Sequence, residues 1–88
     1  MNVEYLDKFY KDIDKISSKI VKKKIIELIQ HIENSSDISQ ISNLKKLVGF
    51  TTAYRIRIGD YRIGIFFKED TVIFARILYR KDIYKLFP

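Results

Sequence analysis

The sequence contains no cysteine and a single histidine, His31. Without cysteine, the chain has no disulfide framework, no thiolate metal site and no cysteine nucleophile. No apolar run approaches the roughly 18 residues that a membrane-spanning helix needs. The first eleven residues also lack the apolar core of a secretory signal. We therefore expect a cytoplasmic protein with no membrane partner.

Most sequence signatures of catalysis are missing as well. The chain has no glycine-rich phosphate loop, no nucleophile elbow and no cluster with metal-ligand spacing. His31 lies in a predicted helix far along the sequence from the arginines, and we expect it at the surface or at the edge of the core. Any chemistry must then be done by arginine, lysine and tyrosine, and we expect neither a metal nor a cofactor.

Net positive charge is found only in the second half of the chain. Residues 1–44 carry seven lysines and seven acidic residues. Residues 45–88 carry ten basic and four acidic residues, which accounts for the whole net charge of +6. A basic half suits a polyanionic partner such as RNA, DNA or an acidic protein segment. It equally suits a solubilising surface, and charge alone does not decide between the two.

Two amphipathic helices are predicted in the first half of the chain. Residues 2–6 alternate weakly as a first strand, and Asp7 is placed to cap the helix that follows. Ser17 and Ser18 are placed to end that helix and to cap a second helix over residues 19–34. The second helix has the clearest apolar stripe in the sequence, made by Val21, Ile25, Leu28, Ile29 and Ile32. The short join between the helices predicts a helical hairpin.

The second half of the sequence is typical of strands. After a polar loop come three strand-like runs, "AYRIRI", "YRIGIFF" and "VIFARIL", separated by Gly-Asp and Glu-Asp turns. The tail "RKDIYKLFP" is predicted to end in a short helix. The order β-α-α-β-β-β predicts one α+β domain over residues 1–88, with a helical hairpin on one face of a small, mainly antiparallel sheet. We expect the other face to be left for solvent or a ligand.

The hairpin "AYRIRIGDYRI" places like charges opposite one another. A two-residue Gly-Asp turn pairs Arg57 with Arg62. It also places Arg55 opposite Gly64, where the missing side chain gives a ligand access to the backbone. Like charges directly across two strands cost under about 1 kcal/mol, and Asp60 is the only acid in this stretch. Because arginine suits multidentate phosphate binding, we predict an anion-binding face rather than a merely solvated surface.

These features resemble the RelE/ParE superfamily of type II toxin–antitoxin toxins over nearly the whole chain. The resemblance rests on "VEYLDKFYKDIDKI", the helical pair, "LKKLVGFTTAYRIRIGDYRIGIF" and the ending "ARILYRKDIYKLF". It implies a toxin with a cognate antitoxin. The arginines favour the RelE branch, known for cutting mRNA in the ribosomal decoding site. The ParE branch instead poisons DNA gyrase and generally lacks the catalytic set.

The resemblance implies a metal-free attack of the RNA 2′-hydroxyl on the adjacent phosphodiester, giving a 2′,3′-cyclic phosphate and a 5′-hydroxyl. Arg57 and Arg62 would stabilise the negative charge of the transition state. Arg80 would hold phosphate or assist the leaving group. Tyr84 would stack on a base or help to deprotonate the 2′-hydroxyl. The residues assigned to RNA binding are Arg55, Arg76, Lys45, Lys46 and Lys81.

Two other functions stay open from the sequence. One is a gyrase inhibitor without nuclease activity, and the other is an inactivated toxin that only holds its antitoxin. The chain also departs from the RelE pattern, because Tyr79 stands where a histidine or a small residue is common. The paired basic positions are often lysine in RelE, and the spacing from Arg80 to Tyr84 is shorter than in some members. The general acid and the general base are therefore left unassigned.

Overall fold

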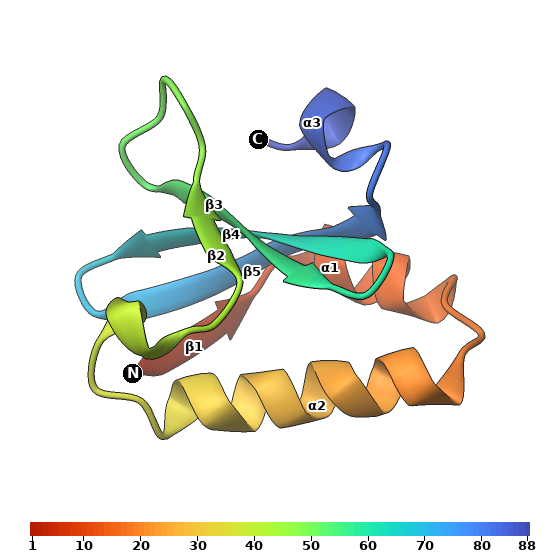
Figure 1. The fold of residues 1–88 in the computed structure, drawn as a ribbon, viewed down its shortest axis with the longest axis horizontal. Helices are drawn as coiled ribbons and strands as arrows, with labels where there is room; N and C mark the ends of the chain where they lie inside the picture. Colours follow the sequence, from red (N-terminus) through yellow and green to blue (C-terminus); the bar gives the residue numbers. More distant parts are fainter.

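In the computed structural model, which describes residues 1–88, three helices and five strands build an α+β fold (Figure 1). The strands are β1 (Asn2–Tyr5), β2 (Leu44–Lys46), β3 (Ala53–Ile58), β4 (Tyr61–Lys68) and β5 (Thr71–Tyr79). The helices are α1 (Asp7–Asp14), α2 (Lys19–Glu33) and the short α3 (Ile83–Leu86), with a 3-10 turn at Ile38–Gln40. The predicted α+β class and the short C-terminal helix are confirmed.

All five strands form one sheet in the order β1-β5-β4-β3-β2. Strand β1 runs parallel to β5, whereas every other neighbouring pair is antiparallel. The predicted turns close the β3–β4 and β4–β5 hairpins. Gly59 has a φ of +60°, and Glu69 and Asp70 have φ values of +51° and +60°, as tight hairpin turns require. The mainly antiparallel sheet is therefore confirmed.

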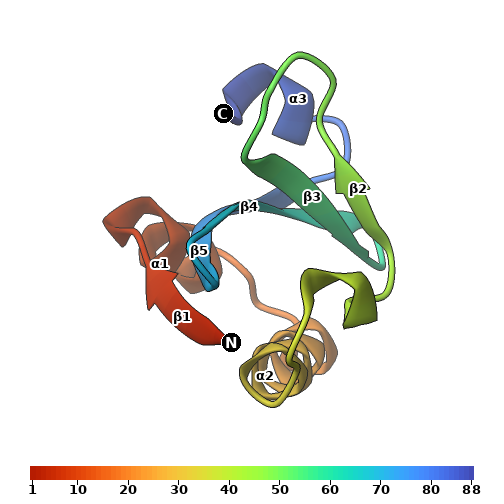
Figure 2. The ribbon, with the colours of Figure 1, turned by 90° about the vertical axis from the view of Figure 1, so that its left-hand side faces the viewer.

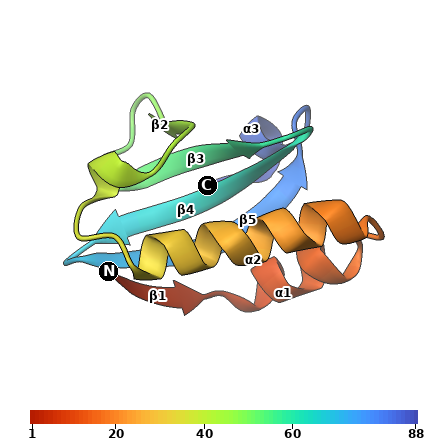
Figure 3. The same cartoon turned by 60° about the horizontal axis from the view of Figure 1, so that its bottom comes forward.

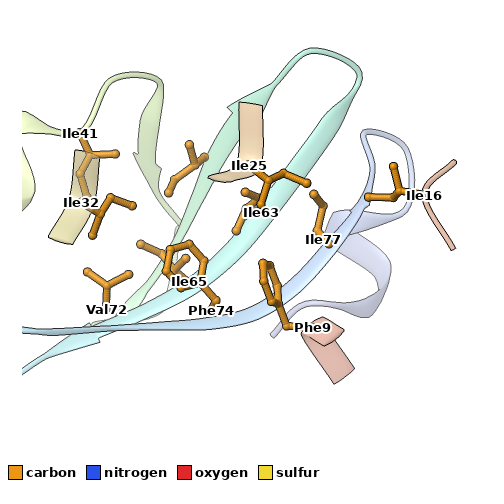
Figure 4. Close-up of a cluster of buried hydrophobic side chains, with 11 residues drawn as sticks. Phe9, Ile16, Ile25, Ile32, Ile41, Ile63, Ile65, Val72, Phe74 and Ile77 are labelled. Atoms are coloured by element: carbon orange, nitrogen blue, oxygen red, sulfur yellow. The ribbon is translucent and has the colours of Figure 1, made fainter. Parts of the chain in front are cut away.

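Helix α2 runs beneath one face of the sheet, and α1 lies beside it near β5 (Figures 2 and 3). The predicted stripe of α2 supplies Ile25 and Ile32, which are 2% and 0% exposed. They meet Ile63 and Phe74 from the sheet, and Phe9 of α1 packs into the same cluster (Figure 4). The helices and one sheet face thus share one main hydrophobic core. None of the helices combines the length and apolar character that crossing a membrane needs.

The start of each helix follows from its local hydrogen bonds. The Ser18 Oγ accepts a hydrogen bond of 3.2 Å from the backbone N–H of Val21, so the predicted N-cap of α2 is confirmed. The prediction for α1 was wrong by one residue. Leu6 is its N-cap, and Asp7 is the first helical residue without a side-chain capping bond. The Asp7 carboxylate still lies in the first turn, where the helix dipole favours negative charge.

Replacing Ser18 with alanine is expected to lower the free energy of unfolding by about 1 kcal/mol, because an orphan N–H at the start of α2 loses its acceptor. Urea denaturation followed by circular dichroism measures this loss. Ser17 is the matched control, because it is also exposed and makes no side-chain hydrogen bond. A Ser17→Ala loss equal to the Ser18→Ala loss would show that the cap is not the cause.

Strand β2 was not predicted from the sequence. It has only three residues and pairs along one edge with β3, where Leu44 faces Ile56 and Lys45 faces Arg55. So short a segment shows no clear alternation, and its pairing depends on β3 being already in place. The prediction of a plain loop for residues 34–43 also misses the 3-10 turn, whose capping box joins Asp37 and Gln40.

The second face of the sheet is covered more than the sequence suggests. Helix α3 folds over it, and a smaller apolar cluster forms there from Leu47, Ala53, Ala75, Ile83 and Phe87. Figure 2 shows α3 and the β2–β3 loop on this side, opposite α2. The expectation of a face left wholly to solvent or ligand is therefore wrong. On this face Arg57 and Arg62 lie next to the β3–β4 turn.

Candidate functional site

The arginine hairpin forms with the predicted register. Arg57 pairs with Arg62, Arg55 pairs with Gly64, and Ile56 pairs with Ile63. Ile56 and Ile63 are 1% and 0% exposed, so one side of the hairpin is core. Strand alternation places the arginines on the other side, where Arg57 is exposed and Arg62 half-buried. The hairpin therefore separates core and charge between its two faces.

The Arg62 side chain is fixed by backbone carbonyls. Its Nη1 donates to the carbonyl oxygens of Gly59 and Tyr61, each at 2.9 Å. Both acceptors belong to the turn end of the hairpin. Since two hydrogen bonds hold the guanidinium, Arg62 presents a preorganised cation and needs no carboxylate to keep it in place.

Four more charged or polar side chains gather around Arg62. Desolvation by burial lowers the pKa of the Arg62 guanidinium. The nearby charges of Arg55, Arg57 and Arg80 lower this pKa further, whereas Tyr84 acts in the opposite direction. These couplings mean that the four side chains lie within electrostatic range of Arg62. The residues predicted to be catalytic, together with Arg55, are thus brought to one place.

Tyr84 reaches the cluster from α3. The Arg55 Nε donates to the Tyr84 hydroxyl oxygen at 3.2 Å, and the Arg55 Nη1 donates to the Asn43 carbonyl oxygen at 3.3 Å. The same carbonyl accepts the Arg57 backbone N–H at 3.2 Å. Asn43 was missed from the sequence, although asparagine is among the residues that tolerate its φ of +62°. Its carbonyl links the end of the loop to both arginines.

Arg80 follows β5 directly and is exposed. Its backbone N–H donates to the carbonyl oxygen of Asp60 at 2.8 Å, which ties the C-terminal segment to the hairpin turn. Among the lysines predicted to bind RNA, Lys45 is opposite Arg55 and so shares its face. Lys46 is exposed at the end of β2, and Lys81 is exposed beyond β5.

Arg76 does not join the cluster, contrary to what its place in β5 suggests. Its Nε and Nη2 donate to the two carboxylate oxygens of Asp12 at 2.7 and 3.1 Å. The Ile77 backbone N–H donates to the same carboxylate at 3.1 Å. The side-chain hydrogen bond from Arg76 to Asp12 raises the pKa of Arg76 more than the negative charge of Asp12 does, and burial acts in the opposite direction. Arg76 therefore joins α1 to β5, and we leave it out of the candidate site.

The space over Gly64 is filled, whereas the sequence predicted it to be open. An ideal Cβ at Gly64 would lie 2.6 Å from two ring atoms of Phe87, so the ring lies directly over this glycine. Phe87 is 4% exposed and follows α3. The predicted opening for a ligand at Gly64 is therefore wrong, because the chain fills it with its own aromatic ring. No pattern in the sequence identifies this contact.

Replacing Gly64 with alanine is expected to displace Phe87, and with it α3 and Tyr84. Overpacking of this kind costs about 1–3 kcal/mol of unfolding free energy. Urea denaturation measures the loss, and NMR of the Tyr84 ring reports its displacement from Arg55. In a Phe87→Ala background the ring is gone, so the Gly64→Ala change should then cost far less. Equal costs in both backgrounds would contradict the contact.

Comparison with known protein families agrees with this fold and site. Residues 3–84 match the family described as ParE toxin of the type II toxin–antitoxin system, parDE. The chain belongs to the RelE/ParE superfamily of type II toxin–antitoxin toxins. It is 40% identical to Toxin RelE3 of Methanocaldococcus jannaschii over 89 residues, covering 100% of both chains. This relative makes the chain similar to RelE toxins in particular.

Solved structures agree with this assignment. The toxin in the RelB–RelE antitoxin–toxin complex of Methanococcus jannaschii is 38% identical, with a TM-score of 0.83, and covers 97% of this chain and 99% of that one. The RelE–RelB complex of Pyrococcus horikoshii OT3 gives a TM-score of 0.71 at 20% identity, covering 90% and 93% of the two chains. At this lower identity the likeness concerns the fold alone.

Proposed function

We propose that the protein is a metal-independent endoribonuclease that cleaves mRNA on the ribosome and so inhibits translation. The observation that carries the proposal is the gathering of uncompensated cations around Arg62. The only ion pair in the structure joins Arg76 to Asp12. The remaining four arginines thus have no carboxylate partner, and an RNA phosphodiester and the more negative phosphorane formed from it would supply the missing negative charge.

In the proposed reaction, the RNA 2′-hydroxyl loses its proton as its oxygen attacks the adjacent phosphorus, and the bond to the 5′-oxygen breaks as that oxygen takes up a proton, leaving a 2′,3′-cyclic phosphate and a 5′-hydroxyl. Arg57 and Arg62 stabilise the additional negative charge on the phosphoryl oxygens. Arg80, whose backbone is tied to the hairpin turn, holds the phosphate on the leaving-group side. Arginine stays protonated, so Tyr84 is the one side chain of the cluster that could serve as a proton donor or acceptor. The ribosome contributes by positioning the message.

The proposed protein partner is a cognate antitoxin. Two solved relatives are RelE chains bound to RelB antitoxins. On this chain, an acidic or amphipathic antitoxin segment lying over the basic face would neutralise the arginines and keep the toxin inactive. Binding would also stabilise the toxin by mass action.

The proposal is tested by tightly controlled expression followed by mapping of 5′ ends on translated messages. We expect growth arrest together with new 5′-hydroxyl ends inside coding regions. Purified toxin added to ribosomes programmed with mRNA should give the same 5′-hydroxyl ends, paired with 2′,3′-cyclic phosphates on the upstream fragments. Growth arrest with intact mRNA would overturn the proposal.

A parallel supercoiling assay with DNA gyrase distinguishes the alternatives. Inhibited supercoiling with intact mRNA would identify a gyrase inhibitor of the ParE kind. Antitoxin binding with neither effect would identify an inactivated toxin. Both results contradict the ribonuclease proposal in different ways, so the two assays together separate the three functions.

A further inference from the structure

A groove of about 310 Å³ lies beside the arginine cluster, between the β2–β3 loop and the C-terminal segment. Figure 1 shows this loop rising on the same side of the sheet as α3. Val48 and Phe50 form the loop wall of the groove, and Tyr84 and Phe87 form the opposite wall. The groove is thus lined mainly by apolar and aromatic side chains, and its volume is at the lower end of the range of small-molecule sites.

The loop wall exposes its apolar side chains to solvent. Val48 is 93% exposed and Phe50 is 49% exposed, although the neighbouring Leu47 is buried at 8%. The backbone N–H of Phe50 donates to the carbonyl oxygen of Leu47 at 3.4 Å, and Gly49 has a φ of +86°. A tight turn anchored by Leu47 therefore holds the Phe50 ring out of the core, at the rim of the groove.

The groove is continuous with the arginine cluster around Arg62. Tyr84 belongs to both, since its ring lines the groove and its hydroxyl oxygen accepts a hydrogen bond from Arg55. Lys45 also lines the groove and is paired with Arg55 across β2 and β3. Lys46 adds a second positive charge to the lining. An aromatic slot next to clustered cations is complementary to a nucleotide, which joins a flat base to a phosphate.

We propose that this groove binds the nucleobase of a nucleotide next to the scissile phosphate, with Phe50 as a stacking wall. The proposal rests on the ribonuclease function proposed above and assigns it a base-binding subsite. Stacking accepts every base, because each has a π-face, and the larger rings of purines stack over more area. Phe50 therefore contributes binding and a modest preference for purines, whereas the arginines contribute the chemistry.

The test measures binding of a short RNA that carries a single 2′-deoxynucleotide at the cleavage position and so cannot be cut. Loss of one base–aromatic stack weakens binding between about 5-fold and 150-fold. We expect this loss for Phe50→Ala and near-complete rescue for Phe50→Tyr. Ile20→Ala is the matched control, because Ile20 is an apolar side chain of α2 that is 70% exposed. It should bind as the unchanged protein does.

A second RNA, with an abasic nucleotide at the neighbouring position, identifies the group that occupies the groove. With this RNA, Phe50→Ala and the unchanged protein should bind equally. A Phe50→Ala variant that binds the intact RNA as tightly as the unchanged protein would overturn the proposal. The proposal would also be overturned if Phe50→Ala lost antitoxin binding but kept RNA binding, because the groove would then be a protein-docking surface.

The outcomes separate this proposal from the ribonuclease function. Phe50-dependent binding without cleavage of the all-ribose RNA on ribosomes would leave the base subsite standing and remove the ribonuclease proposal. Cleavage that is unaffected by Phe50→Ala, in kcat and in KM, would remove the subsite alone. No RNA binding by the unchanged protein would remove the subsite, and the ribosome assay would still decide the ribonuclease function.

Discussion

Replacing Arg62 with alanine is expected to abolish toxicity and leave the fold intact. Arg62 is held by two carbonyl oxygens at 2.9 Å, so in the proposed reaction its guanidinium would be preorganised for the charge that develops on the phosphate. Removing one such donor from a transition state typically costs about 10²–10³-fold in rate. Growth after induction and the rate of cleavage of ribosome-bound mRNA measure this loss.

The stability of the Arg62→Ala variant provides the control. Arg57 and Arg62 are directly opposed like charges, so removing one of them relieves a small repulsion. We expect an unfolding midpoint equal to or slightly above that of the unchanged protein. Lys23→Ala, a charge loss on the exposed side of α2, should change neither toxicity nor stability. A folded Arg62→Ala protein with full toxicity would contradict the role of Arg62.

Replacing Asp12 with alanine is expected to cause the largest loss of stability, about 3 kcal/mol, at the low end of the cost of breaking a buried ion pair. Asp12 is 5% exposed and accepts hydrogen bonds from Arg76 and from the Ile77 backbone N–H. Both donors lose their acceptor in the variant. The Arg76 side chain is 18% exposed, so water compensates for part of the loss. Urea denaturation measures it.

Asp14→Ala, at an exposed position of the same helix, is the control for Asp12→Ala and should be nearly neutral. A second variant, Arg76→Met, tests what the ion pair is for. It should lower stability and leave the cleavage rate per folded molecule unchanged, because the guanidinium is bound to α1 and is absent from the cluster. If the Arg76→Met protein had normal stability but cleaved RNA more slowly, Arg76 would instead belong with the RNA-binding residues.

The arginine hairpin could be predicted from sequence because its determinants are local. A two-residue turn sets the register, and strand alternation then assigns every side chain to a face. The pairing of Arg57 with Arg62 follows from these rules alone. The apolar stripe of α2 and its Ser18 cap are local in the same sense, and they too were predicted correctly.

The errors concern contacts between distant parts of the chain. Arg76 was placed with the other arginines because nothing near it in sequence shows that Asp12 lies alongside. Gly64 was interpreted as an opening because the ring that covers it, Phe87, comes from a segment 23 positions later whose path depends on α3. Strand β2 was missed for a similar reason, since its three residues are a strand only beside β3.

The parallel pairing of β1 with β5 has a consequence for how the protein is made. Strand β1 has no other neighbour in the sheet, and its partner is the last strand of the chain. During synthesis from the N-terminus, β1 must therefore wait for its partner in the sheet until β5 has been made. The arginine hairpin also precedes β5, so its inner face has α2 to pack on but lacks Val72, Phe74 and Ile77 of β5 until then. Arg80 and Tyr84 come later still, after β5, so the candidate site is among the last parts of the fold to be assembled.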